Sequence, residues 1–533
     1  MNNADLIVEV LHRAGIRQGF GIPSGNVLPL MEAMRTGGIE FILTAHEGSA
    51  AFCADVTGRM TGAPGLCIST LGPGATNLST GVGSAFLDRS PLLAITCNLN
   101  VKQLGRRIQM YVDHHALFAP ITKASFALRS GEIVQTLEAA IRTALSEPQG
   151  PVHLDLPEDV ALENSAESVP QIFGAATPLP VADDSALATA AGLIAEANHP
   201  VAVIGASAMR MRNPKLLCQF VEHHNLPFAS TTMAKGLIDE DHPLAIGCIE
   251  RARRQVQRNF LQQADLVVGL GYDTIEVEYE AWIGAIPLLQ IDIEAVDVAA
   301  SVKLIHEVTG DLDYSLAELR QSRAQNQWQA ADIDTHRERF RSALRPFTKE
   351  LAPHHIIDLV RAQLPAEGIL AFDVGAHTHQ IASQWSAHAP RTFLITNGWS
   401  SMGFGLPAGI AAKLAEPQRP VVCLIGDACF QMTCGELATA QRLGLALPVV
   451  VLDDRSLSLI DVKQQRRQYG RSAVDVGNLE IRVPPAHYFG VPALAATDQA
   501  SFEEAFAHAL AAPGPTVIEA RVDPAHYIDT VFD

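Results

Sequence analysis

Short apolar runs alternate with amphipathic stretches from one end of the chain to the other, and this alternation constrains the fold more than any other feature. The clearest apolar runs are residues 41–45, 91–98, 200–207, 265–272, 420–427 and 447–454. Continuous apolar runs flanked by helical stretches are typical of strands buried on both faces of a parallel sheet. We therefore predict the α/β class throughout, with doubly wound parallel sheets.

Two polar stretches interrupt this pattern and indicate how a chain of 533 residues divides into domains. Residues 157–183 are rich in Pro, Ala and acidic side chains, which indicates a linker, and residues 312–350 are charged, which indicates a surface crossover. A chain of this length is too long for one core and is expected to form roughly two to four domains. We predict three domains, over residues 1–160, 184–320 and 350–533.

The composition argues against several classes of function. The formal net charge is -19, whereas nucleic acids and anionic membranes are bound through clustered Lys and Arg. The eight cysteines form no CxxC pair, so neither a zinc knuckle nor a redox motif is indicated. The sequence has no apolar run of about 18 residues to predict a membrane span, and its first residues lack the apolar core of a signal peptide. We expect a cytoplasmic protein with no nucleic-acid or membrane partner.

Acidic residues stand at the ends of two predicted strands in the last third of the chain. Gly426-Asp427-Ala428 follows one apolar run and Asp453-Asp454 follows the next, so Asp454 lies 27 positions after Asp427 (454 − 427). Open α/β sheets bind ligands at the carboxyl ends of their strands. Two carboxylates that converge there can hold a hard cation such as Mg²⁺, and the backbone N–H groups after Asp427 are placed to bind a phosphate. The alternative is that each Asp only ends a strand or caps a helix.

A second group of residues lies in the first third, where the sequence HEGSAAFCAD at residues 46–55 joins a strand end to an apolar helix. Glu47 falls at the helix N-terminus, where the helix dipole favours a negative charge, so helix capping alone would explain it. Tight turns with Gly and Pro follow other predicted strands and suit places where the backbone approaches a ligand. Turns of this kind are residues 21–26 and 71–77. Residues 373–377 stand at the end of another predicted strand, ahead of the segment 395–403.

Together these segments resemble the thiamine diphosphate enzymes, in the branch that contains acetolactate synthases and 2-oxo acid decarboxylases. The spacing of Asp427 and Asp454 resembles that family's Gly-Asp-Gly…Asn-Asn signature, with Ala428 in place of a Gly and an Asp pair in place of the Asn pair. The resemblance implies thiamine diphosphate and Mg²⁺ as cofactors. It also implies that the metal is held by Asp427, Asp454 and the main-chain carbonyl of Ser456.

The resemblance assigns expected roles to further residues. Glu47 would share a proton with the pyrimidine ring of the cofactor and so act in catalysis. Met402 would hold the cofactor in its bent, reactive form, and the carbonyl of Ser400 would accept a hydrogen bond from its amino group. The other expected cofactor contacts are Pro23, Gly25, Asn77, Gly375, His377, Ala428 and Cys429, besides Asp427 and Asp454.

Several segments, such as 112–126 and 233–247, look most like the catabolic, flavin-independent acetolactate synthases. The expected substrate pocket departs from theirs, because Asn26 stands near the position of their Lys and residues 106–110 lack their His-Gln pair. Adjacent histidines also occur in some decarboxylases of this group, but on a strand only one of two neighbours would face the cofactor. The candidates for substrate contact are Asn26, Gln109, His114, His115 and Leu459.

The resemblance implies a pyrimidine-binding, a central and a diphosphate-binding domain, in that order. It implies cleavage and formation of a carbon–carbon bond next to the carbonyl of a 2-oxo acid, by decarboxylation followed by carboligation. It further implies a homodimer or homotetramer, in which each active site lies between the first domain of one subunit and the last domain of another.

Other functions remain open from the sequence. A simple non-oxidative 2-oxo acid decarboxylase is the nearest alternative, and a non-catalytic paralogue that binds the cofactor is an alternative of another class. The glycine turns at 205–207 and 269–271 do not form GxGxxG, which counts against a nicotinamide-dependent oxidoreductase. These turns alone do not predict a flavin or nucleotide in the central domain, and whether this domain binds one stays open from the sequence.

Overall fold

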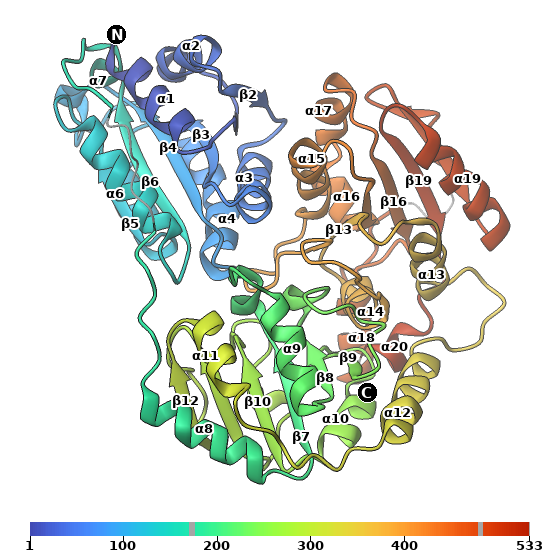
Figure 1. Cartoon of the computed structure of the whole chain (residues 1–533). Helices are drawn as coiled ribbons and strands as arrows, with labels where there is room; N and C mark the ends of the chain where they lie inside the picture. The colour runs from blue at the N-terminus through green and yellow to red at the C-terminus, as the bar shows by residue number, and fades with distance from the viewer. Residues whose placement is uncertain (170–175, 478–482, 532–533) are drawn as a thin grey trace.

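Three α/β domains follow one another along the chain in the computed structural model, which describes residues 1–169, 176–477 and 483–531 (Figure 1). Each domain is built around one sheet, and helices cover both faces of that sheet. The predicted fold class is thereby confirmed. Of the predicted linker at 157–183, residues 170–175 lie outside the described residues.

The first domain has a six-stranded sheet in the order β2-β1-β3-β4-β6-β5, in which all neighbours are parallel. Its strands are β1 Gln18–Gly21, β2 Glu40–Leu43, β3 Gly65–Thr70, β4 Leu92–Asn98, β5 Ala124–Ala127 and β6 Pro151–Pro157. Its helices are α1 Asn3–Arg13, α2 Leu28–Gly37, α3 Glu47–Thr61, α4 Pro73–Leu87, α5 His114–Phe118, α6 Ile133–Leu145 and α7 Glu158–Leu162. The strand order reverses beside β1, and such switch points are where open α/β sheets bind ligands.

The central domain has a six-stranded parallel sheet in the order β12-β11-β10-β7-β8-β9. Its strands are β7 Pro200–Ile204, β8 Phe228–Ser230, β9 Ala245–Cys248, β10 Leu266–Leu270, β11 Leu288–Asp292 and β12 Leu304–Thr309. The helices are α8 Asp184–Glu196, α9 Lys215–His224, α10 Arg254–Leu261, α11 Leu312–Leu319 and α12 Ala330–Ala343. The start of the predicted surface crossover is wrong, because α11 buries Leu312, Leu316 and Leu319 in the core of this domain.

The third domain has a seven-stranded sheet in the order β14-β13-β15-β16-β19-β18-β17, of which only β17 is antiparallel to its neighbour. Its strands are β13 Ile369–Phe372, β14 Phe393–Leu394, β15 Val421–Gly426, β16 Pro448–Asp453, β17 His487–Tyr488, β18 Val491–Ala496 and β19 Thr516–Arg521. The helices are α13 Pro353–Gln363, α14 Ala376–Gln384, α15 Gly405–Ala415, α16 Asp427–Thr433, α17 Glu436–Arg442, α18 Ser458–Arg466, α19 Gln499–Ala511 and α20 Tyr527–Thr530. Among the described residues of all three domains, no helix is long and apolar enough to cross a bilayer.

One apolar run forms a strand that differs from the prediction. β2 lies at the edge of the first sheet, where Ile42 is buried while Glu40 and Leu43 are exposed. An edge strand has a neighbour on one side only, so it is not enclosed as a central strand is. The runs at 91–98 and 420–427 instead form the central strands β4 and β15, which are buried along their whole length.

Helix α3 is enclosed on nearly all sides, and 12 of its 15 residues are buried. It packs against α4 in its own domain and against α15 in the third domain. Phe52 of α3 and Phe404 beside α15 meet edge to face with ring centroids 5.5 Å apart. The thiol of Cys53 donates a hydrogen bond of 3.2 Å to the carbonyl of Pro407. Because Gly, Ala and Ser dominate its first turns, α3 approaches both neighbours closely and joins the first domain to the third.

Two glycines inside helices allow a matched test of this packing. A Cβ on Gly81, in α4, would lie 2.4 Å from the Cβ of Ala51 in α3, whereas a Cβ on Gly192, in α8, meets nothing within 4 Å. We expect Gly81→Ala to lower the free energy of unfolding by about 1–3 kcal/mol because it overpacks the α3–α4 contact. Gly192→Ala should raise it by up to about 1 kcal/mol, since alanine favours a helix. Chemical denaturation measures both, and an unchanged midpoint for Gly81→Ala would contradict this packing.

Candidate active site

A pocket opens at the carboxyl edge of the third sheet, where β13, β15 and β16 end. Its cavity volume is about 100 Å³. All the residues that line it belong to the third domain. The candidates from the sequence that line it are Gly375, His377, Met402, Asp427, Ala428, Cys429, Asp454, Ser456 and Leu459. Segments up to 84 positions apart (459 − 375) are therefore brought to one place by the parallel sheet.

Two carboxylates, the buried Asp427 and the half-buried Asp454, face this pocket at the ends of neighbouring strands. Asp427, the first residue of α16, accepts hydrogen bonds from the backbone N–H groups of Ala428 at 2.7 Å and Arg455 at 2.6 Å. Asp454, just after β16, accepts from the backbone N–H of Ser456 at 3.0 Å and from the hydroxyl of Ser458 at 2.7 Å. These bonds fix both carboxylates, so their oxygens have defined positions at the edge of the sheet.

The electrostatics of the pair favour a bound cation. Burial, and then the charge of Asp454, raise the pKa of Asp427 to about 7. Burial also raises the pKa of Asp454 to about 6, and the charge of Asp453 adds to this rise. Asp453 itself pairs with Arg521 at 2.7 Å, which leaves Asp427 and Asp454 as the acids of the pocket. Oxygen ligands of this kind suit Mg²⁺, so the donor set fits the metal expected from the sequence.

A cradle for an anionic group lies beside the two acids. The ring of His377, at the start of α14, is buried, and its Nε2 atom has no hydrogen-bond partner in the part of the chain that is described. Burial lowers the pKa of His377 to about 4, so the ring is neutral at pH 7. A Cβ on Gly375 or Gly426 would lie 2.7 Å from this ring, so a larger residue at either position would displace the His377 side chain. The unpartnered ring nitrogen and the N-terminus of α14 fit the diphosphate of the expected cofactor.

The loop between β14 and α15 brings Met402 to the same pocket. Asp373 is buried and accepts hydrogen bonds from the backbone N–H groups of Gly403 at 3.0 Å and Gly405 at 2.8 Å. These bonds hold the end of the loop against β13, and Met402 is half-buried beside Gly403. Ser400 is exposed, has a φ of 50°, and does not line the pocket.

The candidates of the first domain gather at the carboxyl edge of the first sheet. Glu47 begins α3 and is 8% exposed, and its carboxylate accepts a hydrogen bond of 3.0 Å from the side-chain amide of Asn77 in α4. Pro23 and Gly25 lie in the loop after β1, where a Cβ on Gly25 would meet nothing within 4 Å. The structure thus forms two groups of candidates, one on each of two domains, and Glu47 does not line the pocket of its own chain.

The substrate candidates are divided between these groups. Leu459 lines the pocket of the third domain, whereas Gln109 is exposed in the loop after β4. The side-chain amide of Asn26 is within 3.2 Å of the carbonyl of Asn98 and 3.3 Å of the carboxylate of Glu158. Asn26 therefore has protein partners already, at the edge of the first sheet.

His114 and His115 belong to the short helix α5, and the strand expected there is wrong. His114 is buried, its Nδ1 lies 3.0 Å from a carboxylate oxygen of Asp155, and its Nε2 accepts a hydrogen bond of 3.2 Å from the backbone N–H of Gly72. His115 is partly exposed, and its Nδ1 lies 2.6 Å from the hydroxyl of Ser125. His114 therefore holds the turn before α4, which carries Asn77.

Sequence reasoning missed several residues that support the site. Glu436, in α17 of the third domain, accepts hydrogen bonds from the backbone N–H groups of Ala45 at 3.0 Å and His46 at 3.2 Å. It thereby fixes the segment that leads to Glu47. A glutamate at a helix start carries no signal of a partner almost 400 positions away, so the pairing becomes visible only in the folded chain.

The chain matches three family descriptions, in the order of its domains. Residues 1–117 match "Thiamine pyrophosphate enzyme, N-terminal TPP binding domain". Residues 187–319 match the central domain of the same enzymes, and residues 373–520 match their C-terminal TPP binding domain.

Known proteins are similar to the chain over nearly its whole length. A probable acetolactate synthase large subunit of Methanocaldococcus jannaschii is 30% identical, over 100% of this chain and 93% of its own length. Acetolactate synthase isozyme 1 large subunit of Escherichia coli is 30% identical, over 98% of this chain and 94% of its own length. Acetolactate synthase of Bacillus subtilis is 28% identical, over 99% of this chain and 95% of its own length.

The raised pKa of Asp427 predicts a pH dependence of metal binding. Asp427 loses its charge as the pH falls through about 7, and a proton on it competes with the cation. We expect Mg²⁺-dependent binding of thiamine diphosphate to weaken by up to about tenfold for each pH unit below that value. Titration calorimetry across neutral pH measures this, and affinity that is independent of pH would contradict the assignment.

The same measurement on Asp454→Asn separates the effect of the Asp454 charge from its role as a ligand to the metal. The amide keeps one oxygen for the metal and removes the charge that raises the pKa of Asp427. We expect the variant to keep Mg²⁺-dependent binding and to shift the midpoint of its pH dependence to lower pH. Asp427→Asn, the matched control, should lose the metal-dependent part of binding. A midpoint left unchanged by Asp454→Asn would show that the two acids do not interact.

Proposed function

The chain belongs to the thiamine pyrophosphate enzymes, and from that premise we propose that it is an acetolactate synthase-like enzyme that decarboxylates a 2-oxo acid and joins the remaining fragment to a second carbonyl compound. It is an enzyme that depends on thiamine diphosphate. The observation that carries the proposal is the pocket in which Asp427, Asp454, His377 and Met402 meet. The acetolactate synthases that match the chain from end to end support the same reaction class.

We assign the binding of the cofactor to the third domain. Asp427, Asp454 and the carbonyl of Ser456 would hold Mg²⁺ against the diphosphate, and His377 with Gly375 would hold the diphosphate itself. Two neighbouring acids repel one another when both are charged, so a divalent cation bound between them would remove that repulsion. When bound, thiamine diphosphate supplies a nucleophilic carbon and accepts the electron pair that is released when carbon dioxide leaves.

We assign the proton chemistry to Glu47. Its carboxylate is nearly buried, and the amide of Asn77 donates to one of its oxygens, which leaves the other free to hold or share a proton. A carboxylate fixed in this way can share a proton with a ring nitrogen of the cofactor, and proton transfer of this kind is general acid–base catalysis.

We propose that the active site is shared between subunits of a homodimer or homotetramer. Glu47 does not line the pocket that contains Asp427 and Met402 of its own chain, which supports a site completed by a second copy. Large apolar side chains are exposed beside both halves, as expected of surfaces that another subunit covers. These side chains are Leu43, Met110 and Val112 in the first domain, and Met432 and Ile460 in the third.

A simple 2-oxo acid decarboxylase is the second candidate. It is favoured by Asn26, which stands near the lysine position of catabolic acetolactate synthases and has protein partners of its own. Both candidates use the same cofactor residues and differ only in whether the fragment is protonated or joined to an acceptor. A cytoplasmic location stays a prediction.

Glu47→Gln tests the proton chemistry. We expect the rate of carbon dioxide release from 2-oxo acids to fall by about 100- to 10,000-fold, because the amide cannot exchange a proton. Binding of thiamine diphosphate should persist, since Glu47 lies outside the diphosphate and metal pocket. Glu40→Gln, at the exposed start of the preceding strand, is the matched control and should keep full activity. Full activity in Glu47→Gln would exclude this role.

Product analysis separates the two candidate reactions. A panel of 2-oxo acids that includes pyruvate is supplied to the Mg²⁺- and thiamine diphosphate-loaded enzyme, and the products are identified by mass spectrometry. We expect a carboligation product that contains two substrate carbon skeletons less one carbon dioxide. Aldehyde as the sole product would establish the simple decarboxylase, and failure to bind thiamine diphosphate at all would exclude both.

A further inference from the structure

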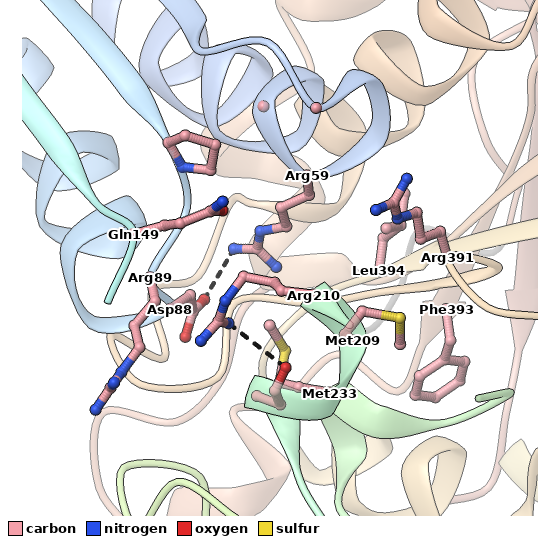
Figure 2. A pocket seen from close by; sticks show the side chains of 14 residues that line it. Arg59, Asp88, Arg89, Gln149, Met209, Arg210, Met233, Arg391, Phe393 and Leu394 are labelled. Atoms are coloured by element: carbon pink, nitrogen blue, oxygen red, sulfur yellow. Dashed lines mark hydrogen bonds and ion pairs between the residues drawn. The ribbon is translucent and has the colours of Figure 1, made fainter. Parts of the chain in front are cut away.

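A buried polar cluster joins the last turn of α3 to the third domain. The guanidinium of Arg59 lies 2.7 Å from a carboxylate oxygen of Asp55 and 2.9 Å from one of Asp88 (Figure 2 shows the pair with Asp88). The same guanidinium donates a hydrogen bond of 2.7 Å to the backbone carbonyl of Ile395. The side chains of Asp55 and Asp88 are at most 1% exposed and that of Arg59 is 14% exposed, so water screens these contacts only weakly.

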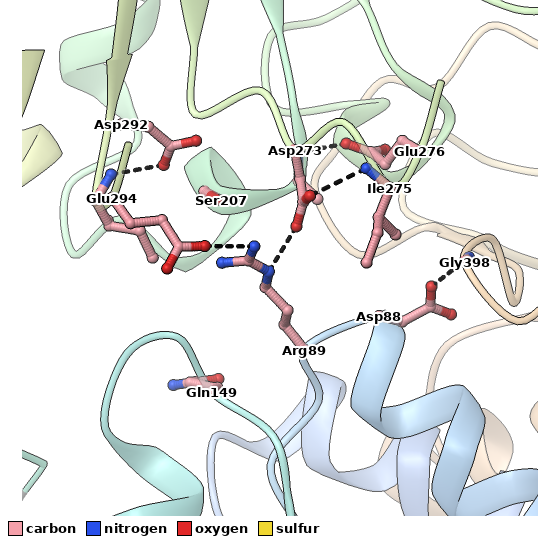
Figure 3. A network of polar contacts seen from close by, with 12 residues as sticks. Asp88, Arg89, Gln149, Ser207, Asp273, Ile275, Glu276, Asp292, Glu294 and Gly398 are labelled. Atoms are coloured by element: carbon pink, nitrogen blue, oxygen red, sulfur yellow. Dashed lines mark hydrogen bonds and ion pairs between the residues drawn. The ribbon is translucent and has the colours of Figure 1, made fainter. Parts of the chain in front are cut away.

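Asp88, directly after α4, holds the backbone that follows Ile395. Its carboxylate accepts hydrogen bonds from the backbone N–H groups of Asn397 at 3.0 Å and Gly398 at 2.7 Å (the second is drawn in Figure 3). The hydroxyl of Ser84 lies 2.9 Å from the hydroxyl of Thr396. Residues 395–398 of the third domain are therefore held by the first domain of the same chain along their whole length.

Packing reinforces these hydrogen bonds. A Cβ on Gly398 would lie 2.7 Å from the Cβ of Leu87, and a Cβ on Gly83 would lie 2.7 Å from the ring of Trp399. Residues 398 and 399 therefore pack directly against the C-terminal part of α4. The residue after Asp88 extends the junction to the central domain, because Arg89 pairs with Asp273 at 2.5 Å and with Glu294 at 2.6 Å (Figure 3).

The segment held in this way leads directly to the pocket. Ser400 and Met402 follow Gly398 by two and four positions, and Asp373 fixes Gly403 and Gly405 on the far side. Only residues 399–402 lie between the two anchors. Ser400 has a φ of 50° in this short stretch, which an L-residue adopts only when its surroundings fix it. A shift at Gly398 would therefore move Met402.

We propose that Arg59 and Asp88 are positioning residues that fix the loop at residues 395–403, which carries Met402. Helix α3 then connects two active sites of the oligomer. Glu47, its first residue, serves one site, and Arg59, in its last turn, positions Met402 for the other. The connection rests on the proposed function, in which the site is shared between subunits. Glu47 and Arg59 are 12 positions apart (59 − 47), which corresponds to roughly 18 Å along a helix. Because α3 is almost wholly buried between α4 and α15, it has the support needed to act as a rigid spacer.

The first test measures the loop in protein free of cofactor and metal, so it does not depend on catalysis. Hydrogen exchange of the backbone amides of residues 395–404 is compared between the natural chain and Asp88→Asn, in which the amide group lacks the charge that strengthens these bonds. We expect exchange at Asn397 and Gly398 to accelerate by about tenfold or more. Arg59→Lys, which keeps the charge and loses the planar guanidinium, should show a smaller acceleration and covers the case in which Asp88→Asn does not fold.

Arg210→Lys is the matched control. Arg210 pairs with Glu147 at 2.8 Å, both side chains are 14% exposed, and the pair joins the first and central domains at the same junction (Figure 2 shows Arg210). The hydrogen bonds and ion pair of Arg210 within the described part of the chain go to Glu147, Ala206 and Ser207, and none goes to residues 395–398. Exchange in the loop should remain unchanged in this variant. Equal exchange in the natural chain, Asp88→Asn and Arg59→Lys would overturn the proposal.

The second test uses mixed dimers, isolated with a different tag on each chain and loaded with Mg²⁺ and thiamine diphosphate. When Glu47→Gln and Asp88→Asn are in the same chain, both sites are damaged, and we expect activity at least about tenfold below that of the natural dimer. When the two substitutions are in different chains, they fall on the same site. The other site stays intact, and about half of the natural activity should remain.

Each other outcome has its own meaning. Half activity with both substitutions in one chain, and loss with them in different chains, would place each active site within a single chain. That result would overturn the shared site and the connection through α3 together. Equal activity of the two arrangements would show that Asp88 affects both sites alike, as a residue that merely holds the domains together would. It would overturn the positioning role and leave the proposed reaction untouched.

Discussion

Parallel strands end at one edge of their sheet, and nearly every functional feature of this chain depends on that constraint. Asp427 and Asp454 face each other because β15 and β16 are neighbours with the same direction. The turns after β1, β2 and β3 meet at the corresponding edge of the first sheet, where Glu47 and Asn77 are in contact. The hydrogen-bond ladder, rather than any contact between the site residues, sets these positions. The side chains at the edge are therefore free to be polar and unsatisfied.

The pocket of the third domain keeps that freedom at a cost in stability. The half-buried Asp454 repels the buried Asp427, and burial together with this charge raises the pKa of Asp427 to about 7. The ring nitrogen of His377 is buried with no hydrogen-bond partner among the described residues. An isolated domain would be more stable with apolar or paired groups at these positions. In the proposed site, a dication bound with a diphosphate would satisfy all three groups at once and so favour binding of the cofactor.

Helix α3 connects this chemistry with the packing of the domains. Its first turns contain Gly48, Ser49, Ala50 and Ala51, whose small side chains let α4 and α15 approach closely. The helix carries Glu47 at one end and the buried Arg59 cluster at the other. Because these small residues let α4 and α15 pack directly against α3, the helix has little room to shift. A site residue and an interdomain contact are therefore held by one rigid element.

The sequence by itself determined the α/β class and the acids of the pocket, because strand periodicity and the Asp427–Asp454 spacing are local and survive any arrangement of the domains. It did not determine that β2 is an edge strand, or that the side chain of His114 turns inward to Asp155 and Gly72. It gave no sign of Asp88 holding Asn397, 309 positions away. These features were decided by the tertiary structure, because a contact between distant segments depends on how whole elements pack. A single sequence shows which residues each helix or strand contains, but not which other helix or strand packs against it.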